Sequence, residues 1–211
     1  MIMNNDIVSV AVALVGAYLL GSFPTAYIVG RLRKGIDIRK VGTRNMGAMN
    51  VIYTLGMAYG ILVLIIDVAK GIAAIMLARW LEVPFTIELV VGGTAVIGHI
   101  FPVFLGFRGG KGGAVCIGVF ASLMPWAVPF GTGIFLLALL ITRFPTFSYS
   151  LALCCFPFVA WLIYNSGALT LFSVIMLLML LARYVPRIRE MRTTSGSWHR
   201  VLLRRSLKDR F

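Results

Sequence analysis

A short loop between two apolar stretches carries both cations and glycines, residues 107–113 with the sequence FRGGKGG. Glycine backbone amides beside a lysine and an arginine are the chemistry that binds a phosphate group. Because the flanking stretches are too long and apolar for a soluble core, a lipid-like substrate can reach this loop from the bilayer. The spacing therefore indicates a site for a phosphorylated, fatty molecule. The candidate catalytic residue here is Lys111, and the candidate binding residues are Gly109, Gly110 and Gly112.

A second loop, residues 35–50 with the sequence GIDIRKVGTRNMGAMN, gathers cations, amide side chains, one hydroxyl and turn-forming glycines. Such groups together can bind phosphate and polyol oxygens. An ordinary basic loop beside a membrane is the alternative, although the apolar Met46, Ala48 and Met49 have no use in a merely solvated loop. The candidate catalytic residue here is Thr43, and the candidate binding residues are Arg39, Gly42, Arg44, Asn45 and Asn50.

Three further ionisable residues lie within apolar stretches. Asp67 and Lys70 stand three residues apart, on one helical face. A lone charge at that depth costs about 2.5 to 3.5 kcal/mol, so the two are expected to pair, either to fix helix packing or to form a substrate or proton path. His99 precedes Phe101-Pro102 and is either a general base or a hydrogen-bonded helix anchor.

The composition is that of a membrane protein. Of 211 residues, 60% are hydrophobic and 13% charged, and apolar runs recur at lengths near the roughly 20 residues that cross a bilayer core. The chain contains seven such runs: Ile7 to Val29, Leu55 to Ala78, Ile87 to Leu105, Gly112 to Leu123, Ala127 to Thr142, Phe147 to Tyr164 and Ala168 to Leu181. The fourth and fifth are short and form either two spans or one kinked element. The composition predicts an all-α integral membrane protein of about seven transmembrane helices.

The basic residues predict the orientation and organisation. All but Lys70 and Arg79 of the 20 lysines and arginines lie in segments that fall on one side of the membrane if there are seven spans. The positive-inside rule then places the N-terminus outside and the C-terminus in the cytoplasm. We expect one membrane domain, residues 1–182, with cytoplasmic site loops at 31–54 and 106–113, and a basic cytoplasmic tail, residues 183–211. The net charge of +13 thus reflects topology, and we expect no nucleic-acid partner.

Several familiar catalytic patterns are missing from the sequence. The glycine loop is not a Walker A element, because Gly112 follows Lys111 where a Ser or Thr would bind magnesium. There is no G-x-S-x-G motif, no His-x-x-x-x-Asp pair and no cluster with metal-ligand spacing. Any acyl transfer here must therefore use an already activated donor, with the protein supplying position and electrostatics.

Five segments carry a family resemblance. Residues 21–24, 35–39, 42–50, 67–71 and 98–112 keep their order and spacing between about residues 16 and 115. On these motifs, the chain resembles the bacterial acyl-phosphate:glycerol-3-phosphate acyltransferases, the PlsY family.

The resemblance implies an enzyme of the bacterial inner membrane that faces the cytoplasm. It would move a fatty acyl group from acyl phosphate to glycerol 3-phosphate, giving lysophosphatidic acid, with membrane lipids around it and neither metal nor other cofactor. By similarity, Lys111 and its glycines hold a phosphate, Arg39, Thr43 and Asn45 complete the polar site, and a substrate phosphate oxygen serves as the base. The alternatives are a small membrane transporter, and a diverged relative with another acceptor or weakened activity.

The sequence departs from the family pattern at particular positions. Arg44 stands where the family usually has glycine, Met49 and Tyr53 where threonine and arginine are usual, and Thr146 at a serine position. The resemblance carries Thr146 over as a substrate-binding residue. These departures leave open whether the acceptor is glycerol 3-phosphate or a different one.

Overall fold

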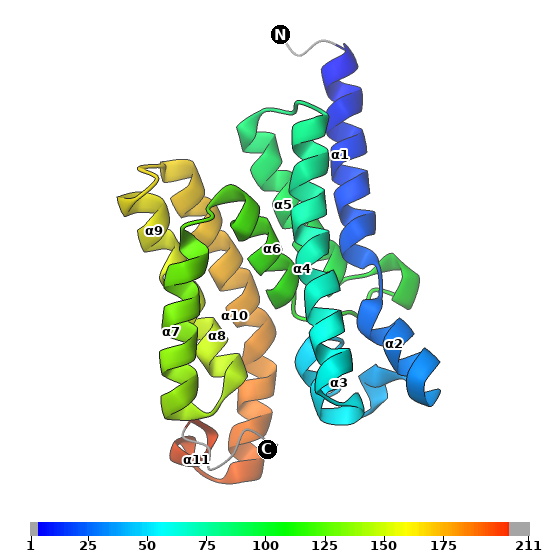
Figure 1. The fold of residues 1–211 in the computed structure, drawn as a ribbon, viewed down its shortest axis with the longest axis vertical. Coiled ribbons are helices and arrows are strands. Elements are labelled where there is room, and N and C mark those ends of the chain that lie inside the picture. Colours follow the sequence, from blue (N-terminus) through cyan, green and yellow to red (C-terminus); the bar gives the residue numbers. More distant parts are fainter. Residues whose placement is uncertain (1–3, 203–211) are drawn as a thin grey trace. The chain divides into compact units, whose positions relative to one another are not determined.

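The computed structural model describes residues 4–202, and within that range every regular element is a helix (Figure 1). The chain divides into two compact units, Met1–Leu123 (unit 1) and Met124–Phe211 (unit 2), which are described separately.

Unit 1 contains six α-helices and two short 3₁₀ helices. They are α1 (Asn4–Ser22), α2 (Thr25–Lys34), η1 (Ile38–Lys40), α3 (Ala48–Leu55), α4 (Met57–Trp80), α5 (Phe85–Ile100), η2 (Val103–Leu105) and α6 (Gly113–Leu123). Helix α4 is central, because α1, α5 and α6 all pack against it, and α1 also packs along α5. The short helices α2 and α3 pack on α4 and on each other, so the segment between them is held against the end of the bundle (Figure 1).

Glycines set how closely α4 and α6 approach. A Cβ added to Gly71 of α4 would collide with the carbonyl of Val115, and a Cβ on Gly118 of α6 would collide with the carbonyl of Val68. Each helix therefore presents a glycine to the backbone of the other. Small residues at helix crossings are typical of membrane bundles, where close backbone packing replaces the hydrophobic effect.

Unit 2 contains five helices: α7 (Ala127–Thr142), α8 (Pro145–Leu153), α9 (Phe156–Leu162), α10 (Gly167–Ser195) and α11 (Trp198–Leu202). Helices α8 and α9 pack between α7 and α10, and α11 folds back on α10. The Ser166 hydroxyl accepts a hydrogen bond from the amide of Leu169 and so caps the start of α10.

The predicted helical membrane protein is confirmed, whereas the number of spans is not. Five segments are long and apolar enough to cross a bilayer: Ile7–Lys34, Met57–Trp80, Phe85–Leu105, Pro145–Leu162 and Gly167–Ser195. Helices α6 and α7 have only 11 and 16 residues. They are about 16 and 24 Å long, less than the roughly 30 Å of the hydrocarbon core. Seven spans and the orientation of the termini therefore stay predictions.

Four predicted runs contain breaks, and one run continues further than expected. The first is interrupted at Phe23-Pro24, between α1 and α2, and the sixth at Cys154-Cys155, between α8 and α9. The second is interrupted near its start at Gly56, between α3 and α4, and the third at Phe101-Pro102, between α5 and η2. Helix α10 continues past Leu181 to Ser195, so the first part of the predicted basic tail is helical. The tail continues through α11 (Trp198–Leu202), and its last residues, 203–211, lie outside the described residues.

Candidate active site

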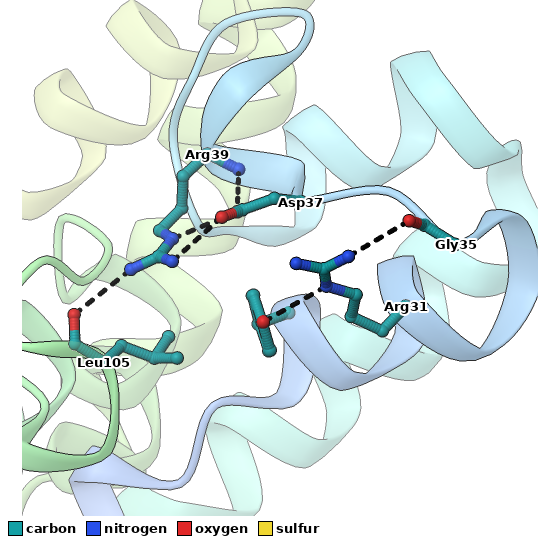
Figure 2. Close-up of polar contacts among 6 residues, drawn as sticks. Arg31, Gly35, Asp37, Arg39 and Leu105 are labelled. Carbon is teal, nitrogen blue, oxygen red and sulfur yellow. Dashed lines mark hydrogen bonds and ion pairs between the residues drawn. The ribbon is translucent and has the colours of Figure 1, made fainter.

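Arg39 joins the basic loop, residues 35–50, to η2, which lies just before the glycine loop. Its Nε and Nη2 donate to Oδ1 and Oδ2 of Asp37 at 3.0 and 2.9 Å, a bidentate pair, and its Nη1 donates to the carbonyl of Leu105 at 3.1 Å. The guanidinium also lies over the Tyr27 ring, 5.2 Å from its centre. Figure 2 shows Arg39 between Asp37 and Leu105. Arg39 therefore connects the basic loop to η2, where Leu105 lies 66 residues further along the chain.

Asp37 prepares this contact. Its carboxylate also accepts a hydrogen bond from the backbone amide of Arg39 at 3.0 Å, which caps η1. The hydrogen bonds from the Arg39 side chain lower the pKa of Asp37 and outweigh its partial burial, while Asp37 raises the pKa of Arg39. Both groups therefore stay charged across the physiological range. Asp37 was not among the expected site residues, although a carboxylate two residues before an arginine is a usable signal.

Asn50, at the start of α3, holds the loop from inside. Its side chain is fully buried. Its Oδ1 accepts from the amide of Thr43 at 2.8 Å, and its Nδ2 donates to the carbonyls of Ile38, Val41 and Asn45 at 2.8, 3.1 and 3.0 Å. The side-chain amide is thus engaged entirely with the loop backbone. This geometry makes Asn50 a positioning residue.

Backbone conformation explains two neighbouring positions. Gly42 has φ +58°, and a Cβ there would collide with Oδ1 of Asn50. Arg44 also has a left-handed conformation, with φ +57°, which is unfavourable for a residue with a Cβ. The glycine that the family usually has at this position would adopt it without strain. Arg44 is exposed, and Thr43 and Asn45 on either side are half-buried.

The glycine loop lies directly on the end of α5. The amides of Gly109 and Gly110 donate to the carbonyls of Ile100 and His99 at 3.1 and 3.0 Å. A Cβ on Gly109 would collide with the His99 carbonyl, and one on Gly112, at φ +86°, would lie 2.7 Å from Val96. Only glycine permits this approach at these positions. The amides of Gly109 and Gly110 therefore anchor the loop to α5.

The two loops meet at Gly110. A Cβ added there would lie 2.7 Å from the carbonyl of Met46, in the basic loop (residues 35–50), and would collide with Nε2 of His99. Arg39 adds a second link between the two regions, because it binds the carbonyl of Leu105 in η2, just before the glycine loop. The basic loop after α2 and the glycine loop before α6 thus form one surface. Lys111 is half-buried there, two residues before the start of α6, whose N-terminus favours an anion.

Behind the glycine loop is a buried group of charged and polar side chains. Asp67 and Lys70 of α4 form an ion pair, and Lys70 Nζ also donates to the carbonyl of Phe23 at 2.6 Å. The His99 ring is buried, with Nδ1 3.9 Å from Oδ1 of Asp67. The predicted pairing of Asp67 with Lys70 is confirmed.

Comparison with known proteins identifies the family. Residues 11–194 match the family model described as glycerol-3-phosphate acyltransferase. The chain belongs to the glycerol-3-phosphate acyltransferase family. A glycerol-3-phosphate acyltransferase 2 of Dehalococcoides mccartyi is 43% identical over 208 residues, 98% of this chain and 99% of that protein. A glycerol-3-phosphate acyltransferase of Geotalea daltonii is 38% identical over 86% of this chain and 93% of its own.

Solved structures agree with this family. The glycerol 3-phosphate form of PlsY (YgiH), an integral membrane glycerol 3-phosphate acyltransferase, matches with a TM-score of 0.82 and 28% identity over 96% of each chain. Its lysophosphatidic acid form matches with a TM-score of 0.80 and 27% identity, over 96% of this chain and 95% of that one. The expected PlsY resemblance is confirmed.

In this acyltransferase-family chain, the predicted site residues fall into two groups. Those in unit 1 lie on or directly behind the joined loops: Arg39, Gly42, Thr43, Arg44, Asn45, Asn50, His99, Gly109, Gly110, Lys111 and Gly112. Thr146 belongs to unit 2, in the first turn of α8, where its carbonyl accepts a hydrogen bond from Ser150. Its place in the site stays a prediction. Among residues 4–202, no group of three His, Cys, Asp or Glu side chains is arranged to hold a metal ion.

Proposed function

We propose that this protein transfers a fatty acyl group from acyl phosphate to the 1-hydroxyl of glycerol 3-phosphate. The products are lysophosphatidic acid and inorganic phosphate. Family membership supports the acceptor, since the relatives are glycerol-3-phosphate acyltransferases and the solved PlsY structures are a glycerol 3-phosphate form and a lysophosphatidic acid form. The donor rests on the chemistry of the site.

The observation that carries the proposal is the contact of the two basic loops at Gly110, supported by the hydrogen bond from Arg39 to Leu105 just before the glycine loop. A reaction between two phosphorylated substrates needs two anion sites close together. The glycine loop offers Lys111 and the N-terminus of α6, and the loop after α2 offers Arg44, the Thr43 hydroxyl and the Asn45 amide. The backbone amides of Gly109 and Gly110 already donate hydrogen bonds to carbonyls of α5. Phosphate binding at the glycine loop is therefore assigned to Lys111 and the start of α6.

The reaction needs no covalent enzyme intermediate. The 1-hydroxyl oxygen of glycerol 3-phosphate attacks the acyl carbon, the bond from that carbon to the phosphate oxygen breaks, and the hydroxyl proton passes to a phosphate oxygen. Acyl phosphate is a mixed anhydride with a good leaving group, which suits a site that supplies charge and position. In this scheme Lys111 stabilises the negative charge that develops on the departing phosphate.

A transporter is the rival explanation that the buried charges Asp67 and Lys70 suggested. The structure satisfies each of them with a local partner, because Lys70 binds both Asp67 and the carbonyl of Phe23. A fixed, paired charge fits helix packing better than a conduction path. The transporter hypothesis predicts flux of glycerol 3-phosphate into vesicles without any lysophosphatidic acid.

The donor assignment is tested with purified protein in nanodiscs, labelled glycerol 3-phosphate, and either palmitoyl phosphate or palmitoyl-CoA. We expect product with palmitoyl phosphate alone. Lys111→Ala should lower kcat/KM by about 100-fold or more, the loss expected when one electrostatic contact to the developing charge is removed. The matched control is Arg33→Ala, which removes an exposed cation that lies over the Tyr59 ring. Normal turnover of Lys111→Ala, or product from palmitoyl-CoA alone, would refute the donor assignment.

We also propose that the joined loops face the cytoplasm. Single cysteines at Lys40 and Arg108, which are exposed, should be protected from an impermeant thiol reagent added outside intact cells. A cysteine at Thr86, at the exposed start of α5, should react. Reaction at Lys40 from outside would reverse the orientation.

A further inference from the structure

The polar group behind the glycine loop is more than an ion pair. Lys70 reaches from α4 to the carbonyl of Phe23, at the break between α1 and α2, and its charge is balanced by Asp67. The side chains of Asp67 and Lys70 are 2% and 5% exposed. One carboxylate oxygen, Oδ1 of Asp67, faces both Lys70 Nζ and His99 Nδ1. Asp67 is therefore placed to act on α5 as well as on its own helix.

The Nδ1 atom of His99 faces Asp67 without making a hydrogen bond to any described residue. Within residues 4–202, Nδ1 of His99 is sealed from solvent and lacks a hydrogen-bond partner. Leaving such a group unpaired is unfavourable, and Oδ1 of Asp67 stands 3.9 Å away. A shift of about 1 Å brings the two atoms to ordinary hydrogen-bond distance. A carboxylate that accepts from Nδ1–H fixes both the tautomer and the ring orientation of a histidine.

The other side of the same ring controls the glycine loop. Nε2 of His99 occupies the space where a Cβ of Gly110 would lie, and the His99 carbonyl accepts from the Gly110 amide. A rotation of the ring would push directly on Gly110, the residue before Lys111. The orientation of His99 and the position of the loop are therefore coupled.

We propose that Asp67 is a positioning residue of the active site. Its Oδ1 accepts a hydrogen bond from Nδ1–H of His99, so that the imidazole is held with Nε2 against Gly110 and Lys111 is presented to its phosphate. The effect on catalysis rests on the proposed function, whereas the His99 tautomer does not. In this arrangement one carboxylate holds the α1–α2 break through Lys70 and the glycine loop through His99.

The direct test is the nitrogen-15 NMR spectrum of the His99 imidazole. The chain has two histidines, so a His199→Gln background leaves His99 as the single signal. We expect Nδ1 to be protonated in the otherwise unchanged protein, and the Nδ1 signal to shift in Asp67→Asn. The matched control is Glu88→Gln, because Glu88 pairs with Arg79 at 2.7 Å between the same two helices without contacting His99. An unprotonated Nδ1, or His99 signals that Asp67→Asn leaves unchanged, would overturn the proposal.

Kinetics give the second measurement. Asp67→Asn should lower kcat/KM for palmitoyl phosphate by about ten-fold or more, and Glu88→Gln should stay within about two-fold of the parent. If Glu88→Gln also lowers kcat/KM ten-fold or more, loss of any polar contact between α4 and α5 would be enough to lower activity. That result would refute a specific role for Asp67. If no variant makes lysophosphatidic acid but Nδ1 is protonated and responds to Asp67, the proposed function fails and the positioning of His99 stands. An Asp67→Asn protein that does not fold leaves the parent spectrum to decide.

Discussion

The conformation of the basic loop, residues 35–50, depends on the side-chain amide group of Asn50. Asn50→Asp keeps the size and the Oδ1 that accepts from Thr43, but it replaces the Nδ2 donor by an oxygen facing the carbonyls of Ile38, Val41 and Asn45. A net hydrogen bond is worth about 0.5 to 1.5 kcal/mol, and a buried group left unpaired costs about 1 to 3 kcal/mol. With two N–H donors lost among three carbonyls, we expect the closed loop to lose about 2 to 4 kcal/mol.

Hydrogen exchange measures this loss locally. The amides to follow are those of Thr43, bonded to Asn50 Oδ1, and of Arg44, bonded to the carbonyl of Val41 at 3.0 Å. A loss of 2 to 4 kcal/mol corresponds to about 30- to 1,000-fold faster exchange where these amides open locally. The protein should keep its overall fold, because the membrane helices do not depend on this side chain. Activity should fall together with the protection of the loop.

A matched control lies one turn away in the same helix. Thr54 Oγ1 donates to the carbonyl of Asn50 at 2.7 Å, and Thr54→Val removes that bond while it keeps the shape. The control should leave exchange at Thr43 and Arg44 nearly unchanged. The reasoning is refuted if Asn50→Asp leaves loop protection intact, or if it abolishes activity while protection is intact. The second outcome would show that Asn50 binds substrate directly.

Three further predictions follow from individual residues. Arg44→Gly should raise the free energy of unfolding by about 0.5 to 1 kcal/mol, because φ +57° is unstrained only for glycine; lower kcat/KM in the same variant would show that the arginine serves substrate binding. The pKa of Asp37 is lowered in the folded protein, so its contribution to loop protection should be constant above about pH 5 and fall only below the usual pKa near 4; Asp37→Asn should lack this acid transition. Asp67→Asn alone should destabilise the bundle by about 3 to 5 kcal/mol in thermal or denaturant unfolding, and added Lys70→Met should restore most of it. Additive losses in the double variant would contradict the pairing.

The hydropathy pattern predicted the helical architecture because lipid leaves few alternatives to a helix. It did not predict the breaks at Phe23-Pro24 and between Leu153 and Phe156, because both interruptions are themselves apolar. At the first break, the carbonyl of Phe23 accepts a hydrogen bond from Lys70, 47 residues further along the chain, and the sequence does not reveal this partner. Helix length was also underestimated for α10, where basic residues follow the apolar ones without a change in backbone structure.

For the candidate site too, residue types were predictive and contacts between distant parts of the sequence were not. Residue types at the two loops were enough to indicate phosphate chemistry, and the family motifs fixed which positions to compare. Contacts over long sequence distances could not be predicted, such as the bond from Arg39 to Leu105 or the approach of Gly110 to Met46. Asn50 was expected among the binding residues because an amide can bind a polyol, but its burial within its own loop points to positioning.

The most direct test of the central claim is the stoichiometry of the reaction. Purified protein, palmitoyl phosphate and labelled glycerol 3-phosphate are incubated together, and lysophosphatidic acid and inorganic phosphate are measured in the same samples. The proposed reaction predicts that one phosphate is released for each lysophosphatidic acid formed. When glycerol 3-phosphate is left out, it predicts no lysophosphatidic acid and no phosphate release above the background without protein. Phosphate release without acylated glycerol 3-phosphate, or no product of either kind from folded protein, would contradict it.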